Sequence, residues 1–312
     1  MTTFRPEGVA VAIRLNRSYL IQRRQGRCRK MELKVVSHVN GDGDILEAWL
    51  KYYRRLGVSS FHLVVHGPRE ENERLYALKD SYPVIIEDTY EGPFDSEEKK
   101  RRLNSLLEGM RGQWLLAVDS DEFVEFPYST ISATIRMLRL IGRNALSAPM
   151  VQHLSSDGSL DSPEVVADPF RAFPLCSVDL YQIMGVQASI SKWPLFFCTA
   201  RTLLREGGNH NCPAGNIGSS MQGVTHHFKF RRSVSQRLDR RIHSAHPWRH
   251  ESVQFQQYLE SHANRLPTIG TFAYSRDALL HRGLLRKFTS MTVLRHVLRS
   301  TEQFLGKDAH NS

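Results

Sequence analysis

Gln113-Trp114-Leu115-Leu116-Ala117-Val118-Asp119-Ser120-Asp121-Glu122-Phe123-Val124-Glu125-Phe126 is the stretch that decides the fold. Its first six residues are apolar except for the glutamine, and an apolar run of this length predicts a strand buried on both faces of a sheet. Acids then occupy three of the next four positions. In an extended backbone, Asp119 and Asp121 would point the same way, with Ser120 opposite.

The paired acids predict a cation site. Two neighbouring carboxylates repel each other and are costly to desolvate unless a cation joins them. Hard oxygen ligands suit Mg²⁺ or Mn²⁺, and open α/β sheets bind their ligands at the carboxyl ends of strands. The alternative is that Asp119 or Asp121 caps a following turn, because Asp-x-Asp is a short pattern. The buried strand in front of the acids favours the divalent cation.

Apolar runs and helical periodicity alternate on both sides of this stretch. We expect strands at 33–39, 61–65, 84–87 and 145–151, and helices at 45–56, 70–79, 96–110 and 129–141. Such alternation predicts an α/β fold with a doubly wound, mostly parallel sheet flanked by helices. Beyond an acidic loop at 155–168, we expect a strand at 224–230 and helices at 233–242, 252–263 and 286–304.

The chain has 312 residues and a net charge of +10, and its basicity is local. Residues 1–30 hold eight Lys or Arg and one acid, and residues 229–250 hold seven and one. We predict a disordered basic arm at 1–30, an α/β domain at 31–235 and a mainly helical extension at 236–312. The basic segments would contact an anionic lipid, a phosphate-bearing substrate or nucleic acid, unless they are simply solvated.

Other features bear on the compartment. No apolar run approaches the ~18–20 residues of a membrane span, and we see no secretory signal. The four cysteines lie far apart, without a Cys-x-x-Cys pair. We therefore expect a reducing, cytoplasmic setting, with peripheral contact at the inner membrane face through the basic segments.

Over about residues 31–235 the chain resembles family-2-type glycosyltransferases, in the branch with an Asp-x-Asp-Glu-Phe motif. The matching pieces are 36–40, 44–50, Tyr53 with 56–58, 114–123, 208–210 and 226–230. The Asp-Ser-Asp-Glu-Phe block at 119–123 and the His-His-Phe block at 226–228 are the most specific. The resemblance implies a GT-A fold, with a nucleotide-sugar-binding α/β half followed by an acceptor half.

The resemblance also implies roles for residues. Asp119 and Asp121 would hold a Mn²⁺ or Mg²⁺ ion that bridges the diphosphate of a UDP- or GDP-sugar, and His227 would be a further ligand. The base and ribose would be faced by residues at the ends of the first and third strands, namely Ser37, Val39, Asn40 and Asp88. The chain departs from the family pattern at 40–43, where an Asn-Glu pair is usual and this sequence has Asn-Gly-Asp-Gly.

Other candidates come from the chemistry of transfer. An inverting enzyme needs a carboxylate to deprotonate the acceptor hydroxyl. The acidic loop offers Asp157 and Asp168, and also Asp161 and Glu164, and the sequence does not choose among them. Two further candidates for donor contact are Lys192, which precedes Trp-Pro, and His210, which follows Gly-Gly-Asn. His226 and His227 are adjacent in an expected strand, so only one of them can face the site.

We expect hexosyl transfer from a nucleotide sugar to a glycan or lipid-linked acceptor, in polysaccharide or glycoconjugate synthesis. A nucleotidyltransferase is an alternative, but it would normally carry a Gly-rich phosphate loop after the first strand, and the acids at 42 and 44 would repel phosphate. A nucleic-acid-binding protein would explain the basic segments but not the buried strand that ends in acids. Nucleic acid is therefore not an expected partner.

Overall fold

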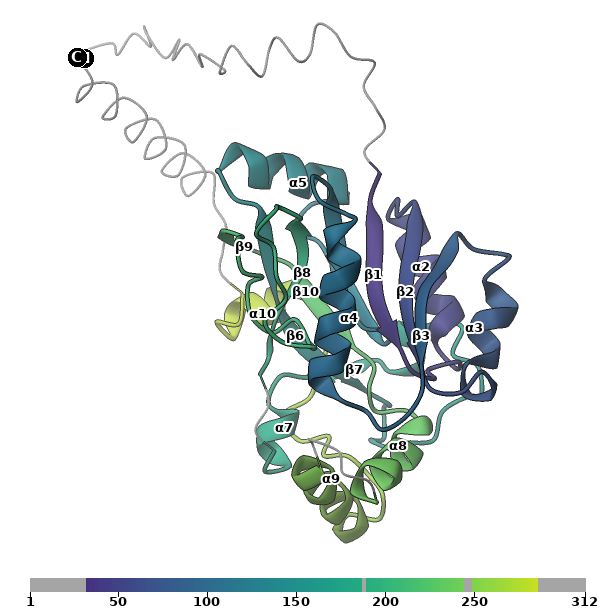
Figure 1. Ribbon diagram of the computed structural model, residues 1–312. Coiled ribbons are helices and arrows are strands. Elements are labelled where there is room, and N and C mark those ends of the chain that lie inside the picture. Colours follow the sequence, from purple (N-terminus) through teal and green to yellow (C-terminus); the bar gives the residue numbers. More distant parts are fainter. Residues whose placement is uncertain (1–31, 187–188, 244–248, 286–312) are drawn as a thin grey trace, which may run out of the picture. The chain divides into compact units, whose positions relative to one another are not determined.

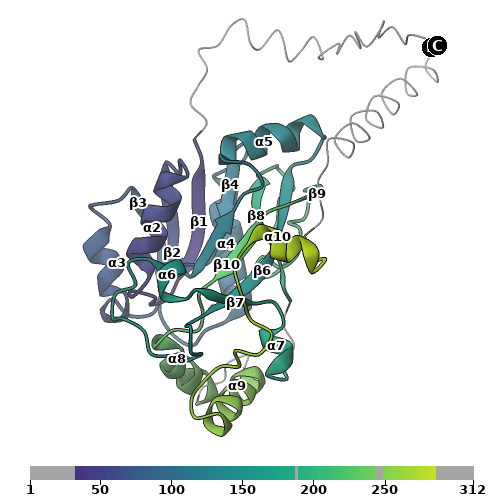
Figure 2. The same ribbon diagram turned by 180° about the vertical axis from the view of Figure 1, so that it is seen from behind.

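The computed structural model describes residues 32–186, 189–243 and 249–285, which lie within one compact unit that begins at Glu32. The expected arm at 1–30 and the helix expected at 286–304 fall outside the described residues. A twisted sheet runs through the unit, and helices cover both of its faces (Figure 1, Figure 2). The expected α/β class is confirmed, whereas the domain boundary expected after residue 235 stays a prediction.

The first half of the sheet is parallel. Its strands are β1 (Lys34–Val39), β2 (Ser60–His66), β3 (Val84–Tyr90) and β4 (Trp114–Ala117). β1 pairs with β2 and β4, and β2 pairs with β3. The connecting helices are α2 (Leu46–Arg55), η1 (Glu70–Asn72), α3 (Glu73–Leu78) and α4 (Ser96–Glu108). Because parallel strands end at the same edge, the segments after β1, β2 and β4 meet there.

The second half of the sheet is mixed. Its strands are β5 (Glu122–Glu125), β6 (Ala145–Leu154), β7 (Leu175–Ser177), β8 (Ser191–Phe197), β9 (Gly218–Gln222), β10 (Val224–His227) and β11 (Phe272–Ala273). β8 lies between β4 and β6 and is antiparallel to both. β10 lies between β5, to which it is antiparallel, and β6, to which it is parallel. The sequence does not predict β8, because a lysine and a proline interrupt its apolar pattern.

The remaining helices are α5 (Ile131–Leu140), α6 (Pro169–Ala172), α7 (Leu180–Ile183), α8 (Ser233–Ile242), α9 (Arg249–Ser261) and α10 (Arg276–His281). In the views of Figures 1 and 2, α4 crosses one face of the sheet and α2 and α3 lie on the other. α8 and α9 pack together beyond the edge where β1 and β4 end (Figure 1).

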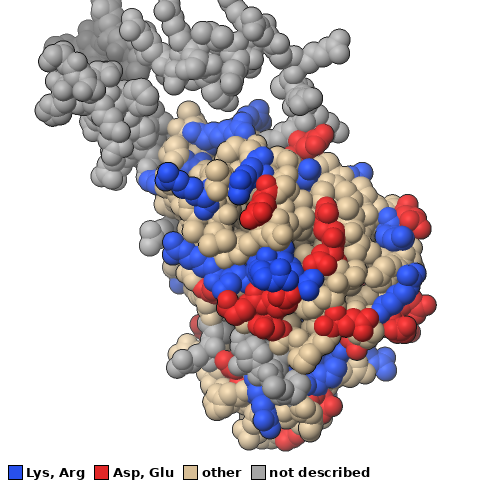
Figure 3. Space-filling view, viewed as in Figure 1, with Lys and Arg blue, Asp and Glu red and all other residues tan. Residues whose placement is uncertain are grey.

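Helix α4 shows why these residues form a covering helix. Asp95 caps its first turn by accepting a hydrogen bond from the Glu97 amide at 2.8 Å. Leu103 and Leu107 are buried against the sheet beside Leu115 of β4. The outer side of α4 carries charges of both signs that pair along the helix, and acidic and basic side chains lie close together on this face in Figure 3.

The acidic stretch is held in place by α2, which packs behind it. The Tyr53 hydroxyl donates to the Glu122 carbonyl at 3.0 Å and accepts from the Val124 amide at 3.1 Å. The neighbouring Tyr52 hydroxyl donates to the Val124 carbonyl at 2.9 Å. These bonds satisfy backbone groups of β5 that its partner strand β10 does not reach, so they position the turn that carries the acids.

Arg231 joins the two halves of the unit. Its side chain is fully buried at the start of α8, and its Nε lies 2.8 Å from Asp44. Its Nη2 contacts Asp42, and its Nη1 donates to the Phe228 carbonyl. Asp42 has a φ of 59°, and Gly41 before it has a φ of 71°. The chain therefore turns tightly after β1 to bring Asp42 and Asp44 to this arginine.

We expect Arg231→Met to lower the free energy of unfolding by about 3–5 kcal/mol, because it leaves buried carboxylates without their partner. Urea unfolding at neutral pH, followed by circular dichroism, measures this loss. The matched control is Arg232→Met at the exposed neighbouring position, where we expect a change within about 0.5 kcal/mol. Equal stability of the two variants would show that the buried ion pairs do not hold α8 to the sheet.

Candidate functional site

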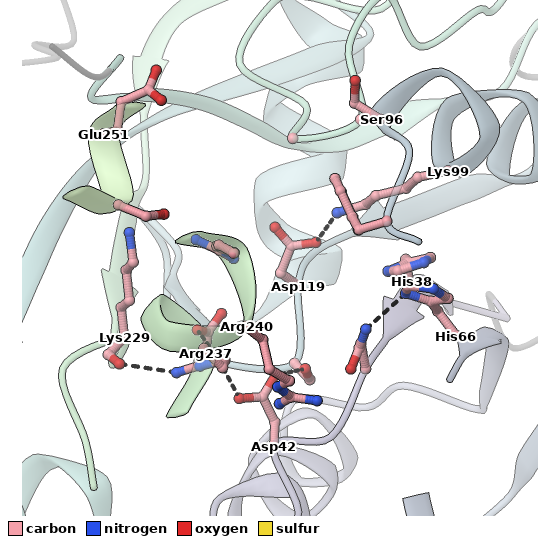
Figure 4. Close-up of a pocket in the computed structure, with 18 of the residues that line it drawn as sticks. His38, Asp42, His66, Ser96, Lys99, Asp119, Lys229, Arg237, Arg240 and Glu251 are labelled. Carbon is pink, nitrogen blue, oxygen red and sulfur yellow. Dashed lines mark hydrogen bonds and ion pairs between the residues drawn. The ribbon is translucent and has the colours of Figure 1, made fainter. Parts of the chain in front are cut away.

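A pocket of about 920 Å³ lies where β1, β2 and β4 end, and α8 and α9 form its other side (Figure 4). Its polar lining comes from strand ends and from the segments that follow them. These residues include His38, Asn40, His66, Lys99, Asp119, Ser120, Asp121, Glu122, Lys192, His210, His227, Lys229 and Arg237. The pocket therefore collects side chains that are far apart in the sequence.

The acidic stretch enters the pocket as a turn. The Glu122 amide donates to the Asp119 carbonyl at 3.1 Å, and the Glu122 carboxylate accepts from the Asp119 amide at 3.2 Å. Ser120 also lines the pocket, and its hydroxyl donates to Asp42 Oδ2 at 2.7 Å. The expectation that Ser120 points away from the two aspartates is wrong, because the strand ends at Ala117 and its alternation ends with it.

Asp119 is held by two lysines. Its carboxylate lies 2.9 Å from Lys99 Nζ and 3.5 Å from Lys192 Nζ, and Lys192 also lies 2.6 Å from Glu122. Burial alone would raise the pKa of Asp119, but the two lysines outweigh burial and lower it. Burial raises the pKa of Glu122. The turn therefore presents a fixed carboxylate at Asp119, with two ammonium groups beside it.

Asp121 faces His227 across the pocket. Their Oδ2 and Nε2 atoms are 3.4 Å apart, and His227 Nδ1 lies 2.9 Å from Gln152 Oε1. Since an amide oxygen only accepts, Nδ1 donates in this contact, and Nε2 is the ring atom that faces the carboxylate. A carboxylate oxygen and an imidazole nitrogen are both ligand types for divalent cations. Arg231 and Arg237 lie further from Asp121 Oδ2, at 3.8 and 3.9 Å.

These residues fit a divalent cation that arrives with a substrate. Among the described residues, no three His, Cys, Asp or Glu side chains come together as a complete metal site. Mg²⁺ is usually bound by one or two protein groups, with substrate phosphates and water filling the other positions. Asp121 and His227 would supply the protein ligands, with Asp119 beside them.

An aromatic and imidazole wall lies at the other end of the pocket, after β1 and β2, where His38 and His66 line the pocket and Tyr90 contacts both rings. His66 stacks on Tyr90 at 4.5 Å between ring centroids, and His38 Nε2 lies 2.8 Å from the Tyr90 hydroxyl. Asn40 Nδ2 donates to His66 Nδ1 at 2.7 Å, which leaves His66 Nε2 to donate to the Gly92 carbonyl at 2.9 Å. Burial lowers the pKa of His38 well below its usual value, so its ring is neutral at neutral pH.

The candidate donor residues divide between the pocket and the core. Asn40, Lys192 and His210 line the pocket. Ser37 and Val39 do not line it and are buried on the other face of β1, because side chains alternate along a strand. His38 takes the position facing the pocket, and the same alternation could have identified it. Asp88 lies outside the pocket and pairs with Arg102 of α4.

The candidate bases also lie outside the pocket. Asp168 caps α6 by accepting from the Arg171 amide at 3.2 Å. Asp157 is exposed, accepts from the Ser159 amide at 3.0 Å and lies 3.3 Å from Arg265. Both acids thus have local structural contacts, and nothing in the geometry brings them to the paired aspartates.

His226 and His227 point to opposite faces of β10. His226 is buried away from the pocket, with its Nδ1 2.9 Å from His153 Nε2 and its Nε2 3.6 Å from Glu125. Burial is the largest influence on the pKa of His226 and lowers it. His226 therefore belongs to a polar cluster behind the sheet.

The sequence matches no protein-family model, and no significant match among curated proteins was found. Among solved structures, the fold is similar to TarS from S. aureus. The structure of TarS 1–349 in complex with UDP-GlcNAc has a TM-score of 0.36 and 11% identity, covering 74% of this chain and 72% of that one. A second structure of TarS 1–349 has a TM-score of 0.34 and 10% identity, with the same coverage. A structure of TarS has a TM-score of 0.32 and 12% identity, covering 77% of this chain and 45% of that one.

The two adjacent histidines give a direct test of the cation site. We expect His227→Ala to weaken Mn²⁺ binding in the presence of UDP by about tenfold, because metal sites typically lose 10–100-fold when a supporting group is removed. Electron paramagnetic resonance of free Mn²⁺ measures this affinity. His226→Ala should reduce thermal stability and leave Mn²⁺ affinity within about twofold of the wild type, since His226 faces away from the pocket. Equal losses of affinity would contradict the assignment of His227.

Proposed function

We propose that the chain is a glycosyltransferase that moves a sugar from a nucleotide-sugar donor to a hydroxyl acceptor with the help of a divalent cation. One observation carries the proposal: Asp119 and Asp121 share a large pocket at the carboxyl end of β4 with Lys99, Lys192 and His227. A leaving diphosphate needs such an arrangement of ligands and cations. The resemblance of the Asp-x-Asp-Glu-Phe and His-His-Phe blocks to family-2-type glycosyltransferases supports the same reaction.

The charge balance of the pocket supports the need for a cation. Nine acidic residues line the pocket against seven Lys and Arg. A diphosphate would therefore enter a pocket that already has more carboxylates than fixed cations. A divalent ion held by Asp121 and His227 would neutralise the charge that develops on the departing diphosphate. Lys99 and Lys192 lie beside Asp119 and would contact the phosphate oxygens directly.

The imidazole and aromatic wall is proposed to hold the nucleobase. His66 and Tyr90 already stack on each other, and the neutral ring of His38 lies against the Tyr90 hydroxyl. Flat rings suit a base, and Asn40 at the end of β1 would add a hydrogen bond. The donor would thus lie along the edge of the sheet, with its base over β1 and β2 and its diphosphate at β4.

We propose Glu251 of α9 as the base that deprotonates the acceptor hydroxyl. Six of the nine acidic residues that line the pocket take part in ion pairs with described residues, and the other three are Glu91, Glu206 and Glu251. Glu91 and Glu206 lie in loops near the donor side, whereas Glu251 lies on the α9 side, as Figure 4 shows. A carboxylate on that side can accept a proton without opposing the diphosphate.

Asp121→Ala should lower sugar transfer or donor hydrolysis by at least about a hundredfold, which is the size of effect typical for losing a transition-state contact. The measurement is a donor screen with UDP-, GDP-, dTDP- and CMP-sugars, with Mn²⁺, with Mg²⁺ and with EDTA. Asp80→Asn at an exposed position is the control and should retain wild-type rates. Failure of the wild type to bind or turn over any of these donors with either cation would overturn the proposed function.

Glu251→Gln should lower the rate of transfer by about 10²–10⁴-fold and leave donor affinity unchanged, because a base acts on the acceptor. Glu260→Gln on the outer side of the same helix is the control. The same assay on Asp157→Asn and Asp168→Asn separates the structural assignment from the sequence-based candidates. If either loop variant loses transfer while Glu251→Gln stays fully active, the base lies in the acidic loop and not at Glu251.

A further inference from the structure

Lys229 lies at the acceptor side of the pocket, two residues beyond His227. Its Nζ lies among three aromatic rings, 4.6 Å from the centroid of Phe255, 5.2 Å from Tyr181 and 5.7 Å from Phe230. The rings belong to α7, α9 and the segment after β10, so three parts of the chain converge on this one ammonium group. Tyr181 and Phe255 line the pocket together with Lys229.

This lysine has no acidic partner within ion-pair distance among the described residues, unlike Lys99 and Lys192. Burial, together with the guanidinium groups of Arg241 and Arg237, lowers the pKa of Lys229 to about 7, against the carboxylates of Asp121 and Glu251. Arg237 is fixed in place, because its Nη2 donates to the Lys229 carbonyl at 3.0 Å and its Nη1 lies 2.8 Å from Asp42. Lys229 thus lies in a locally positive part of a pocket that is otherwise rich in carboxylates.

The position of Lys229 separates it from the donor phosphates. Lys99 and Lys192 come from α4 and β8 and contact Asp119, whereas Lys229 follows β10 and lies beside α8 and α9. Figure 4 shows Lys99 on one side of Asp119 and Lys229 on the other. A single diphosphate next to Asp119 already has two lysines and the proposed cation to neutralise it. A second group of cations across the pocket therefore suits a second anion.

We propose that Lys229, with Arg237 and Arg241 beside it, forms a subsite for a phosphate group carried by the acceptor. The inference rests on the proposed function and specifies its acceptor class. The Lys229 ammonium offers hydrogen-bond donors for the oxygens of phosphate, and the positive charges of the two arginines favour an anion beside it. The rings of Tyr181 and Phe255 exclude water on one side, so a charge-assisted contact there is worth more than on an open surface. The phosphate would orient the acceptor so that its hydroxyl faces Glu251 and the donor sugar.

The test uses inorganic phosphate as the probe and the full-length chain, with the donor site filled by UDP and Mn²⁺. Isothermal titration calorimetry should show phosphate binding to the wild type, and Lys229→Met should weaken it by at least about tenfold, as expected for losing a charged hydrogen bond. Lys229→Arg should restore most of the affinity. Lys79→Met, at an exposed position outside the pocket, should bind phosphate like the wild type. Thermal melting confirms that each variant is folded.

Two further arms identify the source of the phosphate. The first arm compares transfer to a soluble sugar phosphate with transfer to the unphosphorylated sugar. The second compares binding to phosphatidylglycerol vesicles with binding to phosphatidylcholine vesicles. Both arms compare Lys229→Met with the wild type. Loss of the preference for phosphate in either arm supports the subsite and assigns it to a soluble or a lipid-linked acceptor, whereas a preference kept in both arms overturns it.

The inference fails separately from the proposed function. The subsite is overturned if phosphate binds Lys229→Met as tightly as the wild type, or if UDP with Mn²⁺ displaces phosphate completely. In both cases the proposed donor site stands. Failure to bind or turn over any donor of the screen overturns the proposed function, and the phosphate titration without nucleotide then still shows whether Lys229 holds an anion.

Discussion

Arg231 has no solvent-exposed surface, and the arrangement of the pocket depends on how its charge is satisfied. Burial alone would lower its pKa, but the carboxylates of Asp42 and Asp44 outweigh burial and raise it. A buried ion pair of this kind contributes little net stability compared with apolar packing, yet breaking it is costly. Its contribution here is positional. It holds the turn after β1 to the start of α8 and so fixes the sheet side of the pocket relative to the helix side.

The same constraint accounts for the acids at 42 and 44, in the turn where family-2-type glycosyltransferases usually carry an Asn-Glu pair. Acids in this turn would repel a phosphate, which is why a phosphate loop is a poor interpretation of it. In the structure Asp42 contacts Arg231, Arg237 and Ser120, so its charge is used by the protein itself. The turn therefore has a structural task, and under the proposed function the phosphates would contact the lysines around Asp119.

The pocket separates its charges into two groups on either side of Asp119. Lys99, Lys192 and Asp121 form the group at the sheet, and Lys229 with the arginines of α8 forms the group at the helices. Such a separation lets one cavity hold two anionic molecules without mixing their contacts. It also accounts for the basic segment at 229–250, where Arg231, Arg237 and Arg240 are paired with acids.

Among the helices that the structure describes, none has the length and apolar character of a membrane span.

Local pattern was enough to predict the elements with strong periodicity. The apolar run before Asp119 became the buried strand β4, and the alternation of strands and helices through α4 gave the parallel half of the sheet. Five of the candidates named from the sequence line one pocket, and their roles stay predictions: Asp119, Asp121, Lys192, His210 and His227. The sequence did not predict the turn that brings Ser120 to the pocket, because the end of a strand is set by its pairing partners and not by its own residues.

What the sequence by itself determined was the class of fold and the place where its paired acids would lie, because buried strands and strand ends are properties of neighbouring residues. Only the tertiary structure decided which distant side chains meet those acids. It brought Lys229 and Glu251 to the pocket and left Asp157, Asp168 and Asp88 outside it. The physical reason is that local pattern gives a side chain's direction within its own element, and not which distant elements it meets. Those contacts depend on the packing of α8 and α9 across the sheet edge, which Arg231 secures through residues nearly two hundred positions away.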